Sequence, residues 1–206
     1  MSTDFGTARP DTPFRDDVLR VRRNVSWAAF ERYLARKGDR VVPRVMYLDG
    51  VLELVTPSRG HERHGTWIGA LVATWALETE VQLSSFGSWT LTDKLRRAGA
   101  EPDNCFMLGD DSEEKLTRPH FVIEVNWSKR GIDKLEVYRR LGVREVWFWQ
   151  DHTIAVYVLR GDTWQRWKRS ACLPALDLAR LVDFLDRPAM TDAMRDFRRY
   201  LRGASA

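Results

Sequence analysis

The chain has 206 residues, of which 44% are hydrophobic and 11% aromatic, which is enough for one substantial core and requires no second domain. No apolar run approaches the roughly 18 residues of a membrane span, and the N-terminus is charged where a secretory signal would be apolar, so we expect a cytoplasmic protein. The formal charge of +4 permits contact with a polyanion but is ordinary for this length.

The two cysteines, Cys105 and Cys172, stand singly among apolar neighbours. Without a CxxC or Cys/His grouping, neither a disulfide framework nor a structural zinc site is expected, and both should be buried thiols.

The first 24 residues contain Pro10, Pro13 and few large hydrophobic side chains, which predicts an extended arm outside the core, with residues 25–206 as a single domain. From Ser26 to about Arg36, apolar side chains recur at helical spacing. The runs 44–48 and 51–55 then flank an Asp-Gly step, which tolerates the positive φ angles of a type I′ turn and predicts a β-hairpin.

After Pro57-Ser58, a broad apolar face that includes Trp67 predicts the longest helix, through about Glu78. The rest of the chain alternates strand and helix signals, and the charged stretch from Asp110 to Arg118 reads as a loop. We predict strands at 81–86, 89–91, 105–108, 121–125, 145–149, 154–159 and 163–167, and helices at 132–141, 176–185 and 191–201. This order is typical of a mixed α/β fold.

Two further patterns have alternative interpretations. The aromatic run 147–149 could form a subunit interface, but a short, continuously apolar run favours a buried core strand. The basic clusters at 166–169 and 195–202 could contact phosphate, although a solvated basic face is the simpler interpretation.

Carboxylates occur at the ends of two predicted strands. Asp103 follows Pro102 at a strand start, and Glu124 lies near the end of the apolar run 121–125. If these strands are neighbours, the two acids can converge on a hard divalent cation, which neutralises a phosphodiester and activates water for attack. Lys134, on the following helix, would then point toward that water.

Each of these residues also has an ordinary structural interpretation. Asp103 is a common turn residue, Glu124 could face solvent at a sheet edge, and a lysine in a first helical turn is usually solvated. Glu53, on the hairpin, could be an extra acid in the site, but its alternation with two valines favours an edge position.

Several segments together resemble the Uma-two family of the restriction-endonuclease-like PD-(D/E)xK superfamily. They are the stretch from Asp49-Gly50 through Pro57-Ser58 to His61, the Pro102-Asp103 step, and above all 121–125 followed by 131–147. The resemblance covers about 45–159. It implies an αβββαβ core in which a mixed sheet holds a metal site at one edge. The Trp67 helix would be the first helix of this core. The additions to the core would be an N-terminal helix and hairpin and the C-terminal helices.

By resemblance, Asp103 and Glu124 match the acids that hold Mg²⁺ or Mn²⁺, Lys134 matches the lysine of the next helix, and His61 contacts the metal or the phosphate. The resemblance also implies DNA as the substrate. Because many restriction-type nucleases cut both strands as dimers, it further implies a homodimer.

One departure from the superfamily matters. The lysine of its simplest pattern lies two residues after the glutamate, where this chain has Asn126, so Lys129 and Lys134 compete for the role. The leading hypothesis is a magnesium-dependent endodeoxyribonuclease. The alternative is a catalytically inactive nuclease-fold domain that binds nucleic acid or protein.

Overall fold

The computed structural model describes residues 17–109, 118–125 and 131–204. The helices are α1 (Trp27–Lys37), α2 (Arg59–Glu78), α3 (Lys134–Leu141), α4 (Leu178–Val182) and α5 (Met190–Ala204). The strands are β1 (Val18–Arg22), β2 (Arg44–Leu48), β3 (Val51–Thr56), β4 (Leu83–Ser85), β5 (Leu91–Asp93), β6 (Ala98–Ala100), β7 (Asn104–Leu108), β8 (Phe121–Val125), β9 (Glu145–Gln150), β10 (Thr153–Arg160) and β11 (Thr163–Trp167).

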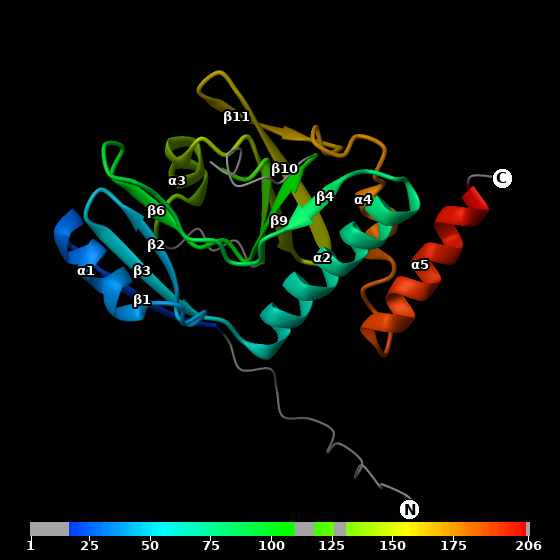
Figure 1. Ribbon diagram of the computed structural model, residues 1–206, viewed down its shortest axis with the longest axis horizontal. Coiled ribbons are helices and arrows are strands. Elements are labelled where there is room, and N and C mark those ends of the chain that lie inside the picture. Colours follow the sequence, from blue (N-terminus) through cyan, green and yellow to red (C-terminus); the bar gives the residue numbers. More distant parts are fainter. Residues whose placement is uncertain (1–16, 110–117, 126–130, 205–206) are drawn as a thin grey trace, which may run out of the picture.

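These strands form two sheets (Figure 1). The first is antiparallel, with the order β1-β3-β2-β6-β5. The second has the order β11-β10-β9-β8-β7-β4 and is mixed, because β8 and β9 run parallel while the other pairs are antiparallel. The chain crosses from the first sheet to the second between β6 and β7, at residues 101–103.

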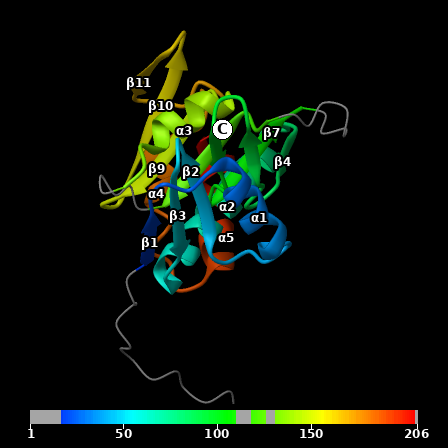
Figure 2. The same ribbon diagram turned by 90° about the vertical axis from the view of Figure 1, so that its left-hand side faces the viewer.

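Alternation of side chains along the strands divides the interior into three cores. On β2, Val45 and Tyr47 face α1, while Met46 faces the layer that contains α3. On β8, Val122 faces α3, and its neighbours Phe121 and Ile123 face α2 and the C-terminal helices. Helix α3 therefore lies between the two sheets, α1 covers the outer face of the first sheet, and α2, α4 and α5 cover the second (Figures 1 and 2).

The expected αβββαβ core is confirmed. Its members are α2, then β4, β7 and β8, then α3, and then β9, which pairs parallel with β8. The hairpin formed by β5 and β6 is inserted between β4 and β7 and joins the first sheet.

Local sequence signals set several element boundaries. The side chains of Ser26, Ser58 and Asp133 accept hydrogen bonds from the backbone amide three residues later and so cap α1, α2 and α3. Asp49 and Gly50 have φ angles of 43° and 90°, as a type I′ turn requires.

The N-terminal arm differs from the prediction in its last residues. Within the predicted arm of residues 1–24, β1 pairs with β3 along five residues, so this part belongs to the first sheet. The side chains of β1 are exposed, so the sequence shows no apolar pattern that would predict a buried strand there. Residues 1–16 and the charged loop at 110–117 lie outside the described residues.

Two smaller differences occur later in the chain. Strand β6 was not predicted, since its Ala-Gly-Ala sequence carries no bulky side chain. The helix expected at 176–185 is reduced to α4, which ends at Val182.

The aromatic run of β9 is buried in the protein, as its apolar continuity predicts, and so does not form an exposed interface strand. Cys105 is buried as expected, whereas Cys172 is only half-buried. Among the described helices, none combines the length and apolar character needed to cross a membrane; a cytoplasmic location stays a prediction.

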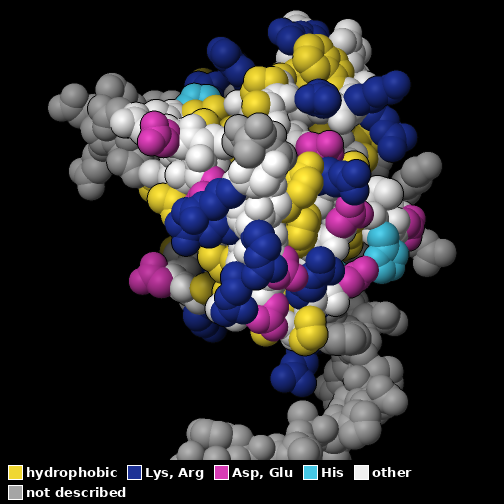
Figure 3. Space-filling view, turned by 90° about the vertical axis from the view of Figure 1, so that its right-hand side faces the viewer, with side chains coloured by type: hydrophobic (Ala, Val, Ile, Leu, Met, Phe, Trp, Pro, Cys, Tyr) yellow, Lys and Arg dark blue, Asp and Glu magenta, His cyan; other side chains and the backbone are white. Residues whose placement is uncertain are grey.

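The basic side chains of α5 are ion-paired. Arg198 and Arg202 contact Glu78 of α2 at 2.5 and 2.7 Å, and two other arginines pair with aspartates three residues earlier. In Figure 3, Lys and Arg side chains are interspersed with acidic ones over this side of the molecule. The pattern agrees with a solvated, internally paired face.

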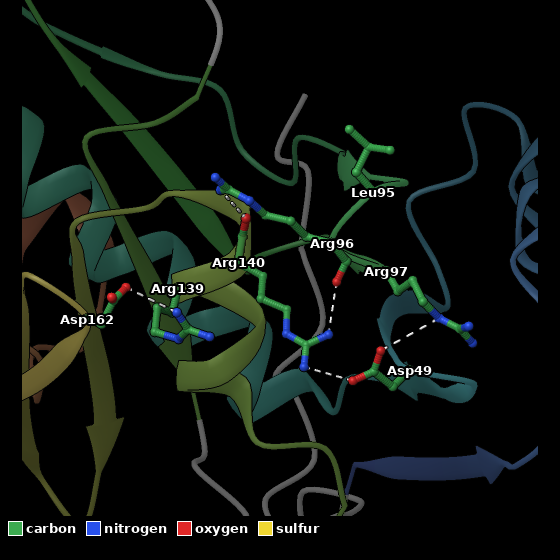
Figure 4. Close-up of a pocket in the computed structure, with 7 residues that line it drawn as sticks. All are labelled: Asp49, Leu95, Arg96, Arg97, Arg139, Arg140 and Asp162. Atoms are coloured by element: carbon green, nitrogen blue, oxygen red, sulfur yellow. Dashed lines mark hydrogen bonds and ion pairs between the residues drawn. The ribbon is translucent and has the colours of Figure 1, made fainter.

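Arginine side chains also join three turns to the end of α3 (Figure 4). Arg96 and Arg140 each donate to the other's backbone carbonyl at 2.9 Å. Arg140 also contacts Asp49 at 2.7 Å, and Arg139 reaches Asp162 at 3.2 Å. Because these guanidinium groups already have partners, we interpret the pocket of about 420 Å³ between them as a structural junction that fixes α3.

Candidate active site

Asp103 and Glu124 converge, as the sequence argument requires. Strands β7 and β8 are antiparallel neighbours with Asn104 opposite Ile123, so continuing the register by one residue sets Asp103 opposite Glu124. Residues opposite each other in an antiparallel pair point to the same face of the sheet. In addition, Oδ2 of Asp103 accepts a hydrogen bond of 2.7 Å from the amide of Val125.

The carboxylate of Asp103 is held by two cationic side chains. Oδ1 lies 2.6 Å from Nη1 of Arg44, and Oδ2 lies 2.7 Å from Nε2 of His61. Burial alone would raise the pKa of Asp103, but the hydrogen bond and charge of His61, together with the charge of Arg44, lower it below its ordinary value. Asp103 is therefore ionised.

His61 lies between two carboxylates. It stands in the first turn of α2, and its Nδ1 is 2.7 Å from Oδ2 of Asp17, whose other oxygen accepts a bond from the amide of Ser58. Burial would lower the pKa of His61, yet Asp103 and Asp17 outweigh it and raise the pKa to about 9. With both ring nitrogens engaged, His61 orients Asp103.

Glu124 is bound by residues of α3. Nζ of Lys134 lies 2.5 Å from Oε2, and the hydroxyl of Tyr138 donates to Oε1. Burial, together with the charge of Asp103, raises the pKa of Glu124 against the opposing effect of Lys134. Burial would lower the pKa of Lys134, but the charges of Glu124 and Asp103 raise it, so Lys134 is protonated.

Glu53 belongs to this cluster, and the expectation of a solvent-facing edge residue is wrong. It shares a face of β3 with Val51 and Val55, as predicted, but α3 covers that face and Glu53 is buried. Its Oε1 accepts from the amide of Ile132. Burial raises its pKa, with the Ile132 hydrogen bond opposing.

Ten residues enclose a small cavity, and four of them are the carboxylates Glu53, Glu101, Asp103 and Glu124. The lining residues are Arg44, Val45, Met46, Glu53, Val55, His61, Glu101, Asp103, Glu124 and Lys134. Its volume of about 30 Å³ is close to the space of one water molecule in the liquid. A wall with several carboxylate oxygens and no cysteine suits a hard divalent cation such as Mg²⁺ or Mn²⁺.

The carboxylates are nevertheless occupied by protein groups. Within the described residues, no three Asp, Glu, His or Cys side chains are arranged to hold one ion. The oxygens of Asp103 and Glu124 are taken by Arg44, His61, Lys134 and Tyr138. A cation at these oxygens would therefore replace an existing partner, most directly the ammonium or guanidinium group.

The sequence-based candidates are thus largely brought together. Asp103, Glu124, Lys134 and His61 all line the cavity. The competing Lys129, like Asn126, lies outside the described residues. Sequence reasoning missed three contributors to the site, and these are Arg44, Tyr138 and Asp17. The one signal that could have indicated Arg44 is a cation at the start of an otherwise apolar strand.

The model of the Uma2 family, described as "Putative restriction endonuclease", matches residues 27–189, well over half of the chain. No curated protein matches the sequence.

Proposed function

The chain belongs to the Uma2 family, and on that premise we propose that it is a metal-dependent endonuclease that hydrolyses phosphodiester bonds of DNA. The proposal is supported above all by the common cavity of Asp103, Glu124 and Lys134, which come from a strand start, a strand end and a helix start. Burying such charges together costs stability, which a purely structural role does not require.

Each residue has a role that follows from its contacts. Mg²⁺ or Mn²⁺, when bound, neutralises charge on the phosphodiester and activates water. Asp103 and Glu124 would hold the ion, and the protonated Lys134 would orient the attacking water and offset negative charge as it develops on the phosphoryl oxygens. His61 and Arg44 fix the direction of the Asp103 carboxylate.

One observation favours the alternative, a catalytically inactive nuclease-fold domain that binds nucleic acid or protein. Both carboxylates already have a cationic partner, so the cluster is electrostatically satisfied by the protein itself. In this alternative Lys134 and Arg44 are permanent replacements for the ion.

The test is incubation of supercoiled, linear and single-stranded DNA with Mg²⁺ or Mn²⁺. We expect cleavage by the wild-type protein and at least about 100-fold slower cleavage by Asp103→Asn, Glu124→Gln and Lys134→Met, because each loses a metal ligand or an electrostatic contact. Asp39→Asn and Lys168→Met, at exposed positions, serve as matched controls.

Calorimetric titration with Mn²⁺ separates the two functions. Binding that is lost in the Asp103→Asn, Glu124→Gln double variant supports the nuclease. A folded wild-type protein that neither binds the ion nor cuts any of the three DNA forms would leave only the non-catalytic alternative.

The proposal includes a homodimer, since cutting both strands of a duplex is simplest with two sites. The aromatic run of β9 is buried and takes no part in such an interface. Gel filtration at two protein concentrations tests dimerisation, and a monomer at both would remove it from the proposal.

A further inference from the structure

A groove of about 540 Å³ runs beside α2 and ends at the proposed catalytic residues. Its volume lies within the roughly 300–1,000 Å³ that is typical of small-molecule sites. The lining residues are Val41, Arg44, His61, Glu62, Gly65, Thr66, Gly69, Ala70, Ala73, Ser85, Gly87, Ser88, Asp103 and Asn104. Three of them, Arg44, His61 and Asp103, also line the acidic cavity, so the groove adjoins it.

Arg44 carries an unsatisfied hydrogen-bond donor at this junction. Its side chain is only 9% exposed, and its two terminal nitrogens contact Asp103 and Glu62 at 2.6 and 3.0 Å. Its Nε, however, is one of two buried side-chain nitrogen or oxygen atoms of the described residues that have no hydrogen-bond partner. A buried donor without an acceptor lowers stability, so an acceptor supplied by a ligand is favoured here.

We propose that this groove binds one nucleotide of a single DNA strand, with its phosphate at Nε of Arg44 and its sugar and base along α2. The proposal rests on the proposed nuclease function and names the part of the substrate that the protein grips beside the cleavage site. An anionic oxygen is the natural partner of a guanidinium donor, and charge-assisted hydrogen bonds of this kind are the strong ones.

The charges around the groove limit the occupant to about one phosphate. Arg44 is already paired with Glu62 and Asp103, His61 also contacts Asp103, and the remaining lining residues carry no charge. A duplex needs a row of cations along its backbone. A mostly neutral groove with one available donor fits a single nucleotide better.

The shape of the groove agrees with a flat, uncharged group. Beyond His61 and Glu62 in its first turn, α2 lines the groove with small residues, none larger than threonine: Gly65, Thr66, Gly69, Ala70 and Ala73. This open wall gives a base or sugar close contact with the helix.

The test uses a fluorescein-labelled single-stranded oligothymidylate, with binding followed by fluorescence anisotropy in EDTA so that no cleavage consumes the probe. We expect Ala70→Phe, which fills the groove, to weaken binding at least about tenfold. Leu77→Phe adds similar bulk at an exposed position of the same helix outside the groove and should bind as the wild type does.

Competition with unlabelled ligands tests the phosphate contact. Thymidine monophosphate should displace the probe at concentrations at least about tenfold lower than thymidine does, because only the monophosphate supplies an anionic phosphate oxygen as the acceptor for Arg44. Arg44→Lys keeps the charge but lacks Nε, and it should abolish this difference, with circular dichroism melting as the check on folding.

Three results would overturn the proposal: unchanged binding by Ala70→Phe, equal competition by thymidine and its monophosphate, or preference for duplex over single-stranded probe. Cleavage assays distinguish a failure of the groove proposal from a failure of the proposed nuclease function. If Ala70→Phe binds and cuts DNA like the wild type, the groove assignment fails while the nuclease stands. If the wild type binds as expected but never cuts, the nuclease fails and the groove stands.

Discussion

Buried charges in this protein are held by specific partners. Glu101, for example, accepts from the amide of Val45 and from Lys37 at 2.8 Å, which ties α1 to the first sheet. Glu145 accepts from Ser170 and from two backbone amides that follow it. Such groups are costly to bury and more costly to leave unpaired, so removing one partner has a measurable effect on stability.

Tyr138 offers a direct measure of this cost. Tyr138→Phe removes the hydroxyl that donates to Glu124 and leaves one carboxylate oxygen without that donor. We expect the free energy of unfolding to fall by about 1.5–3 kcal/mol, as measured by urea denaturation. Tyr200→Phe, at an exposed position, is the control and should change it by less than about 0.5 kcal/mol. Equal unfolding midpoints for the two variants would contradict the contact.

The raised pKa values of the two cysteine thiols predict that their reactivity toward alkylating agents depends on pH. Burial raises the pKa of Cys105 to about 11, and burial together with Glu145 raises that of Cys172 above its ordinary value. Because the thiolate is the nucleophile, the native protein at pH 8 should react slowly with iodoacetamide, and Cys105 should become reactive only as the pH approaches 11. Urea-unfolded protein, in which both thiols are exposed, is the control. Rapid modification of Cys105 in folded protein at pH 8 would contradict this assignment.

The helices and strands that could be predicted from the sequence are those with a strong local sequence signal. The Asp49-Gly50 turn and the capped helices carry their own chemistry and were predictable from the sequence. Strand β6 was not, because Ala98–Ala100 lacks bulky side chains and is made a strand by its neighbours β2 and β5. The burial of Glu53 was not predicted, because the helix that covers its face of β3 is α3, which is distant in sequence.

The small side chains of β6 have a physical reason that can be tested. A Cβ at Gly99 would lie 2.6 Å from Cζ of Phe30, so glycine lets α1 approach the first sheet. Gly99→Ala should therefore lower the free energy of unfolding by about 1–3 kcal/mol through overpacking. Gly203→Ala is the matched control, because no atom lies within 4 Å of a Cβ there. Denaturation curves in which Gly99→Ala equals the wild type would show that Phe30 yields without cost.

For the molecule as a whole, the candidate site is a junction between two sheets. Asp103 and Glu124 belong to the β7 and β8 side, and the sequence and its family resemblance indicated them together with Lys134. Arg44 and Glu53 come from the first sheet and Asp17 from the N-terminal segment. No local pattern connects these segments, because they come from different sheets that only the tertiary fold brings together.

The N-terminal segment contributes both a strand of the first sheet and a residue of the candidate active site. Its removal should therefore affect the stability of the protein. Deletion of residues 1–22 removes β1 and the Asp17 carboxylate that contacts His61 and Ser58, and it exposes the edge of β3 that faces away from β2. We expect a lower melting temperature and concentration-dependent aggregation, because an unpaired strand edge can pair with another molecule. Deletion of residues 1–16 removes none of the contacts that the structure describes and is the control. If both truncations melt and remain monodisperse alike, in calorimetry and light scattering, then β1 and Asp17 contribute nothing to the fold.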